Sequence, residues 1–84
     1  MSKYLVEAFV PRSQAPEARA AARDARTAAH QLAREGTPIR YVRTTFLPDD
    51  ETCFHVFEAV SEEVVAEACR RAGIGPGRIV WAIE

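Results

Sequence analysis

Residues 52–73, TCFHVFEAVSEEVVAEACRRAG, decide the fold of this chain, because they join a strand directly to a well-marked helix. From residue 52 to residue 58 the side chains alternate between two faces, as a strand requires. Cys53, His55 and Phe57 share one of these faces. The thiol and the imidazole make this strand the place where we expect site chemistry.

The helix that follows carries clear start and stop signals. Ser61 is suited to cap its first turn, because a serine hydroxyl accepts a hydrogen bond from a free backbone N–H. Gly73 followed by Ile74 resembles a Schellman ending, in which the glycine adopts a left-handed conformation. A buried stripe is expected along one side of the helix, at Val64, Val65, Ala68, Cys69 and Ala72.

The rest of the chain supplies a second helix and three more strands. Residues 3–10 and 39–47 are rich in β-branched and aromatic side chains, and residues 78–83 form a last short strand. A long helix opens near Pro16 and stops at Gly36. The order βαββαβ predicts a single α+β domain over residues 1–84, a ferredoxin-like sandwich with strand order 4-1-3-2 and both helices on one face.

In that arrangement the first and third strands are central. We expect Val6 and Ala8 to face the helices together with Phe54 and Val56. The open face of the sheet would then carry Leu5, Glu7, Phe9, Cys53, His55 and Phe57. Such an apolar face exceeds the patch that a monomer normally exposes. The sequence therefore predicts a homodimer formed through the open sheet face.

Composition excludes several classes of partner. A net charge of −1 on 84 residues gives no field that would recruit nucleic acid or an anionic membrane. No stretch approaches the roughly 20 apolar residues that span a bilayer, and the N-terminus lacks the apolar run of a secretory signal. We therefore expect a cytoplasmic protein, whose two cysteines stay thiols in a reducing compartment.

Short motifs along the chain resemble a known family. The opening KYLVE, the strand ending FHVFEA, the following SEE and the helix ending RRAGI are similar to the DUF4242 family, and the similarity covers nearly the whole chain. His55 stands where the family strand usually has a cysteine, and Ala68 where its helix usually has a histidine. The resemblance implies a dimeric ferredoxin-like protein that binds nickel or another divalent transition metal.

Glu7, His55 and Cys53 are the candidate site residues. If they share the open face, Glu7 and His55 lie on adjacent strands, close enough for a carboxylate–imidazole pair or for shared metal ligation. Cys53, two residues from His55, could join them. Two donors cannot enclose a metal alone, so a dimer would have to add ligands.

Three function classes follow from these residues. The first is a small dimeric metal-binding protein of the nickel type, with Glu7, His55 and Cys53 as ligands. The second is a small dimeric enzyme, such as an isomerase, a cyclase or a cofactor-free oxygenase, in which Glu7 and His55 act as base and acid. The third is an assembly module without chemistry. Fold alone does not choose among them.

Overall fold

The computed structural model describes all 84 residues, and its elements follow the predicted order. Two short 3-10 turns, Arg12–Gln14 and Pro48–Asp50, precede the long helix and connect the second strand to the third. The regular elements are β1 (Ser2–Phe9), α1 (Ala15–Arg34), β2 (Ile39–Leu47), β3 (Thr52–Ala59), α2 (Glu62–Ala72) and β4 (Arg78–Ala82).

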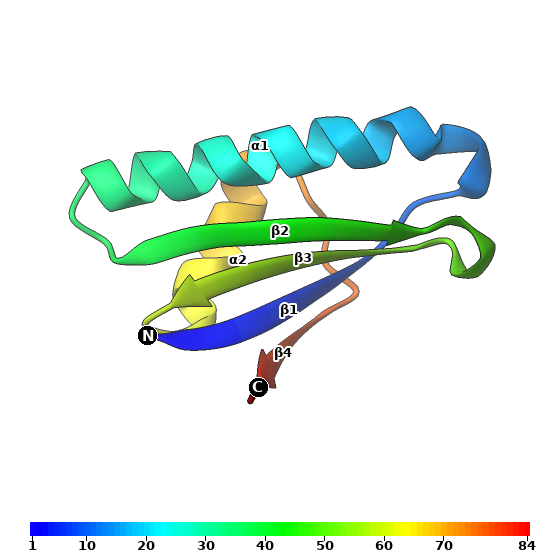
Figure 1. Cartoon of the computed structure of the whole chain (residues 1–84). Coiled ribbons are helices and arrows are strands. Elements are labelled where there is room, and N and C mark those ends of the chain that lie inside the picture. The colour runs from blue at the N-terminus through cyan, green and yellow to red at the C-terminus, as the bar shows by residue number, and fades with distance from the viewer.

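The four strands form one antiparallel sheet in the order β2-β3-β1-β4. This is the predicted order 4-1-3-2 read from the other edge, so the ferredoxin-like α+β fold is confirmed. The helix α1 runs along β2, and α2 crosses beside it on the same side of the sheet (Figure 1).

Both helices end as the sequence predicts. Gly73 lies in the left-handed region at φ 72°, and the backbone N–H of Ile74 donates to the Cys69 carbonyl over 2.9 Å, which completes a Schellman ending. Gly36 has φ 96° and ends α1 in the same way. At the other end of α2, the Ser61 hydroxyl accepts a hydrogen bond from the Val64 N–H.

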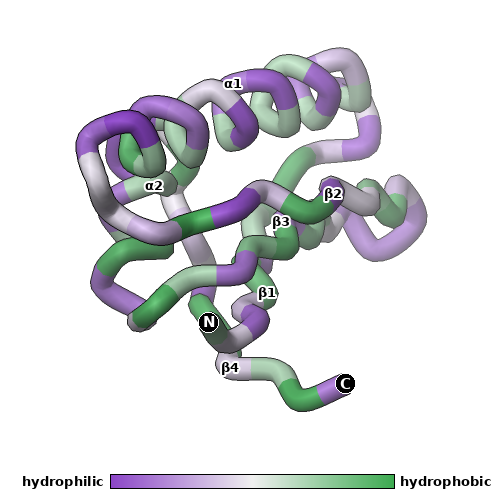
Figure 2. Tube along the Cα trace, turned by 60° about the vertical axis from the view of Figure 1, so that its left-hand side comes forward, coloured by the Kyte–Doolittle hydropathy of each residue, from purple (hydrophilic) through white to green (hydrophobic).

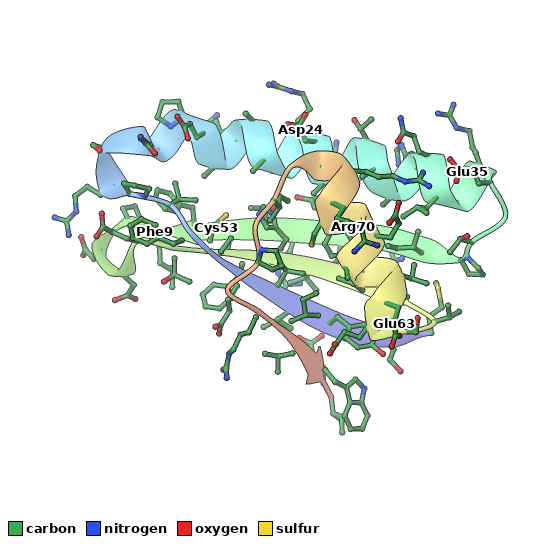
Figure 3. The ribbon with its side chains drawn as sticks, turned by 180° about the vertical axis from the view of Figure 1, so that it is seen from behind. Phe9, Asp24, Glu35, Cys53, Glu63 and Arg70 are labelled. Atoms are coloured by element: carbon green, nitrogen blue, oxygen red, sulfur yellow. The ribbon has the colours of Figure 1, made fainter.

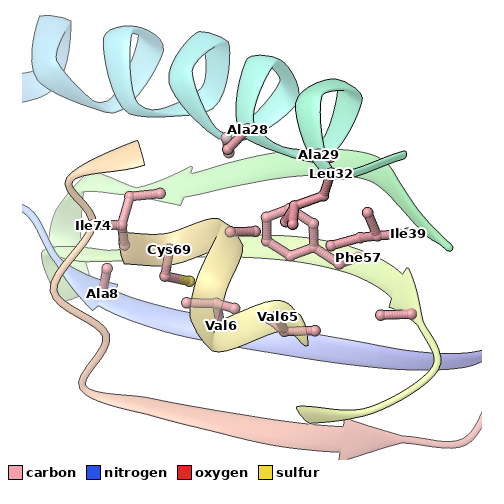
Figure 4. Packing of buried hydrophobic residues seen from close by; sticks show 13 residues of the cluster. Val6, Ala8, Ala28, Ala29, Leu32, Ile39, Phe57, Val65, Cys69 and Ile74 are labelled. Atoms are coloured by element: carbon pink, nitrogen blue, oxygen red, sulfur yellow. The ribbon is translucent and has the colours of Figure 1, made fainter. Parts of the chain in front are cut away.

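The hydrophobic core lies between the sheet and the two helices (Figure 4). Phe57, on β3, is fully buried at its centre, and its ring meets the Tyr41 ring edge-on at 5.9 Å. Small residues on α1 let that helix approach the sheet closely. The α1 residues in this core are Ala25, Ala28, Ala29 and Leu32, all in its C-terminal half. Figure 2 shows the matching alternation of hydrophilic and apolar residues along the helix.

The face assignment of β1 is confirmed, but that of β3 is wrong. Val6 pairs with His55 and Ala8 pairs with Cys53, and directly opposed residues of an antiparallel pair project to the same face. Cys53, His55 and Phe57 are therefore buried toward the helices, whereas Phe54 and Val56 belong to the open face. Both rows of β3 are largely apolar, so alternation alone does not tell which one faces inward.

No helix of the structure is long and apolar enough to cross a membrane.

Candidate functional site

His55 is the only polar residue among the buried ones, with 1% of its surface exposed. Its ring lies on the helix side of the sheet and uses both nitrogens. The Thr44 hydroxyl oxygen lies 2.7 Å from Nδ1, and the Cys53 sulfur lies 3.7 Å from Nε2. Figure 3 shows the Cys53 side chain in the layer between α1 and the sheet. Cys53 and His55 therefore form one buried thiol–imidazole pair.

A β-bulge brings two further hydroxyl groups to this pair. The pairing of β2 with β3 shifts by one residue between Tyr41 and Arg43, so Tyr41 opposes Phe57 and Thr44 opposes His55. Regular alternation would separate Tyr41 and Thr44, three residues apart, onto opposite faces. With the bulge, both face the helices, and the Tyr41 hydroxyl donates to the Thr44 oxygen over 2.7 Å. Sequence reasoning missed Thr44, because no residue pattern marks this bulge.

Burial keeps the thiol and the imidazole of this pair neutral. Desolvation lowers the pKa of His55 below its ordinary 6.5 and raises the pKa of Cys53 above its ordinary 9.0. A neutral thiol is a poor nucleophile, so the geometry does not describe an activated catalytic cysteine. The second thiol, Cys69, is a buried core residue on α2, and burial raises its pKa to about 11.

The expectation that Glu7 and His55 share one face is wrong. Glu7 pairs with Phe54 across the sheet and projects to the open face, where Arg78 donates to its carboxylate over 2.9 Å. Its side chain keeps 32% of its surface exposed, so solvent and the guanidinium compensate its charge. The sheet itself separates this carboxylate from the buried imidazole. The predicted acid–base pair is therefore not formed within one chain.

Two openings reach the buried network from different sides. A pocket of about 150 Å³ has His55 in its lining, together with Glu17 of α1 and the loop after α2 at Gly73–Gly75. A larger pocket of about 330 Å³ lies between α1 and β2. Tyr41 and Thr44 line this larger pocket. The chain of contacts from Tyr41 through Thr44 and His55 to Cys53 thus connects one opening with the other.

The donor pair satisfies part of what a transition metal needs. Bond lengths of roughly 2.3 Å to sulfur and 2.1 Å to nitrogen, as found for zinc, place two ligands about 3.6 Å apart at a tetrahedral angle. The 3.7 Å between Cys53 Sγ and His55 Nε2 fits that separation. However, no three His, Cys, Asp or Glu side chains gather anywhere in the chain in a way that would hold a metal. One chain therefore offers two well-placed donors and lacks the others.

Comparisons with known proteins support the fold and identify a family whose description names nickel. The crystal structure of SCO4226 from Streptomyces coelicolor A3(2) superposes with a TM-score of 0.65 over 96% of this chain and 95% of that one, at 16% identity. No curated protein matches the chain. A family model described as nickel responsive protein SCO4226-like matches residues 4–81, which is nearly the whole sequence. This chain therefore belongs to the SCO4226-like family of nickel-responsive proteins.

Proposed function

We propose that the protein is a small metal-binding protein of the nickel-responsive type, with Cys53 Sγ and His55 Nε2 as its donors to nickel or another divalent transition metal. The observation that carries the proposal is the 3.7 Å separation of these two atoms in a buried layer. Thiolate and imidazole are the ligand types that borderline transition metals prefer. Membership of a nickel-responsive family supports the same conclusion.

The surroundings of His55 suit ligation through Nε2. Metal-binding histidines almost always hydrogen-bond through the other ring nitrogen, which fixes the ring and the tautomer. Here the Thr44 oxygen lies 2.7 Å from Nδ1, and Tyr41 in turn holds that hydroxyl. The backbone pairing of Thr44 with His55 fixes both side chains on rigid strands. Nε2 is then the nitrogen left for a ligand.

The thiol makes metal binding depend on pH. A thiol binds a metal as the thiolate, so binding displaces the Cys53 proton into solvent. Burial raises the pKa of Cys53, which favours the protonated form when no metal is present. Metal affinity should therefore rise with pH across the neutral range.

The remaining ligands must come from outside this donor pair. Glu17 lines the same opening as His55, but its carboxylate does not gather with Cys53 and His55 as a third ligand. Water or a second subunit would supply the rest. Glu7 has no part in this arrangement, because it lies on the other face of the sheet.

We also propose that a second copy of the chain covers the open face. Leu5 and Val80 are neighbouring half-buried apolar side chains on that face, next to Val56, which is already covered within one chain. Ion pairs lie on both sides of these side chains, with Glu7–Arg78 on one side and Arg40–Glu58 on the other. Arg43, opposite Val56 on the same face, is in none of the ion pairs. The paired charges do not repel a second copy, and the half-buried apolar side chains of two such faces can bury one another.

Sedimentation tests this proposal: Val80→Glu should reduce the mass of the wild-type dimer to that of a monomer. Ala33→Glu, on the exposed side of α1, is the control and should stay dimeric. Equal masses for wild type and V80E would contradict the proposal.

Nickel titration of protein purified without a histidine tag tests the metal site. Thiolate-to-metal charge-transfer absorption should appear in wild type and disappear in Cys53→Ala, while Cys69→Ala, which removes the other buried thiol, should retain it. His55→Gln should weaken binding at least about tenfold, because it removes one of two chain donors. Glu7→Gln should bind as wild type does.

Two results would contradict the metal proposal. One is a wild type that stays free of metal at stoichiometric nickel, in which case a stable dimer would favour a non-catalytic assembly role. The other is binding that survives loss of both Cys53 and His55, which would place the metal elsewhere.

A further inference from the structure

The pocket of about 330 Å³ between α1 and β2 lies outside the hydrophobic core. The α1 residues of the core begin at Ala25, whereas the cavity lies under the N-terminal half of α1, where Ala18 and Ala22 face the end of β2. In Figure 4 the core side chains gather below the C-terminal half of that helix. Its volume of about 330 Å³ falls within the range of small-molecule sites, about 300–1,000 Å³.

The lining combines apolar walls with a few polar groups. Four of the seven lining residues carry no polar side-chain group, namely Ala15, Ala18, Ala22 and Phe46. The polar groups are the guanidinium of Arg19 and the hydroxyls of Tyr41 and Thr44. Arg19 takes part in none of the ion pairs of the structure, so its charge is available to a ligand.

We propose that this cavity binds a small organic carboxylate with an apolar body, either aromatic or branched aliphatic. Arg19 is exposed and therefore stands at the mouth, where its planar guanidinium can hold a carboxylate through two hydrogen bonds. The apolar body contacts the alanines and Phe46. A phosphate fits less well, because a single cation over apolar walls leaves most of its oxygens without donors.

Thr44 couples the cavity to His55. The Thr44 oxygen already accepts the Tyr41 hydroxyl, so its one hydrogen goes either to His55 Nδ1 or into the cavity. A carboxylate that accepts this hydrogen leaves Thr44 as an acceptor for Nδ1–H. The ring then keeps an Nε2 lone pair directed at Cys53, which is the form that a metal needs. The consequence for metal affinity rests on the proposed function, whereas carboxylate binding itself does not.

Titration of the metal-free protein with sodium benzoate, followed by backbone amide NMR, tests the cavity. Saturable shifts are expected in α1 and β2, and benzyl alcohol, the uncharged counterpart, should bind at least about tenfold more weakly. Arg19→Gln should raise the benzoate Kd at least about tenfold, whereas Arg23→Gln, one turn further along the same helix, should leave it unchanged. Ala22→Leu fills part of the cavity and should weaken both ligands.

The opposite results would overturn the proposal. Absence of saturable shifts, or equal affinity for benzoate and benzyl alcohol, would show that the cavity does not select a carboxylate. An unchanged benzoate Kd in R19Q would show that Arg19 does not bind the carboxylate. Ring nitrogen shifts of His55 report its tautomer during the same titration. Benzoate should move them toward the Nδ1–H form, and a ring that does not respond would refute the coupling. Because no metal is present, failure here is distinguishable from failure of the nickel site.

Discussion

The buried imidazole of His55 should make the stability of the fold depend on pH in a window where few other groups titrate. His55 is 1% exposed, and desolvation lowers its pKa below 6.5. In the unfolded chain the ring regains its ordinary pKa, so the unfolded state binds more protons than the native state below pH 6.5. The free energy of unfolding is therefore greatest above this pH and falls as the pH drops below it.

The size of the effect follows from a single proton. The loss between pH 8 and pH 5.5 is up to about 1.4 kcal/mol, reached if the native ring stays neutral throughout. The glutamates with lowered pKa values, such as Glu35 and Glu67, titrate below their ordinary 4.5 and lie outside this range. The buried thiols Cys53 and Cys69 affect the pH dependence of stability only near pH 9.0, the ordinary pKa of a thiol, because burial raises their pKa in the native state.

Urea unfolding followed by far-ultraviolet circular dichroism at half-unit steps from pH 5.5 to pH 8 measures this slope. His55→Gln should flatten it, even if the variant is less stable overall, because the slope depends only on the titrating group. His30→Gln, on the exposed side of α1, serves as the matched control and should keep the slope. A wild type with constant stability over the range, or an unchanged slope in H55Q, would refute the account of a neutral buried ring.

Three further changes test the packing. Gly73→Ala should lower the free energy of unfolding by about 1 kcal/mol through strain at φ 72°, and strain is the only cost because nothing lies within 4 Å of the added methyl group. Gly75→Ala meets no contact and no positive φ, so its free energy of unfolding should be near that of wild type in the same urea assay. Phe57→Ala should cost about 3–5 kcal/mol, because it empties the centre of the core, and a loss below 1 kcal/mol would show that the core has collapsed around it. Ser61→Ala should lower thermal stability by about 0.5–1 kcal/mol, since its capping bond is long at 3.4 Å; no change would mean that the cap is inactive.

The order of elements and their ends were determined by local sequence. Gly36 and Gly73 end the helices, because a left-handed residue is needed there and glycine adopts that conformation without strain. Ser61 starts α2, and Pro11 lies two residues after Phe9, the last residue of β1. Each of these signals acts within a few residues of its own position. The βαββαβ order and its ferredoxin-like topology could therefore be predicted from the sequence.

The inward face of β3 and the composition of the site were decided by the tertiary structure. Both rows of β3 are apolar enough to be buried. The register with β1 sets Val6 opposite His55, so Cys53 and His55 face the helices. Glu7, in the other row of β1, projects to the open face. Thr44 joined them only because a bulge in β2 reversed the alternation. Local sequence supplies the period of a strand, but which face is buried and where the period slips depend on pairing and packing between segments far apart in the chain.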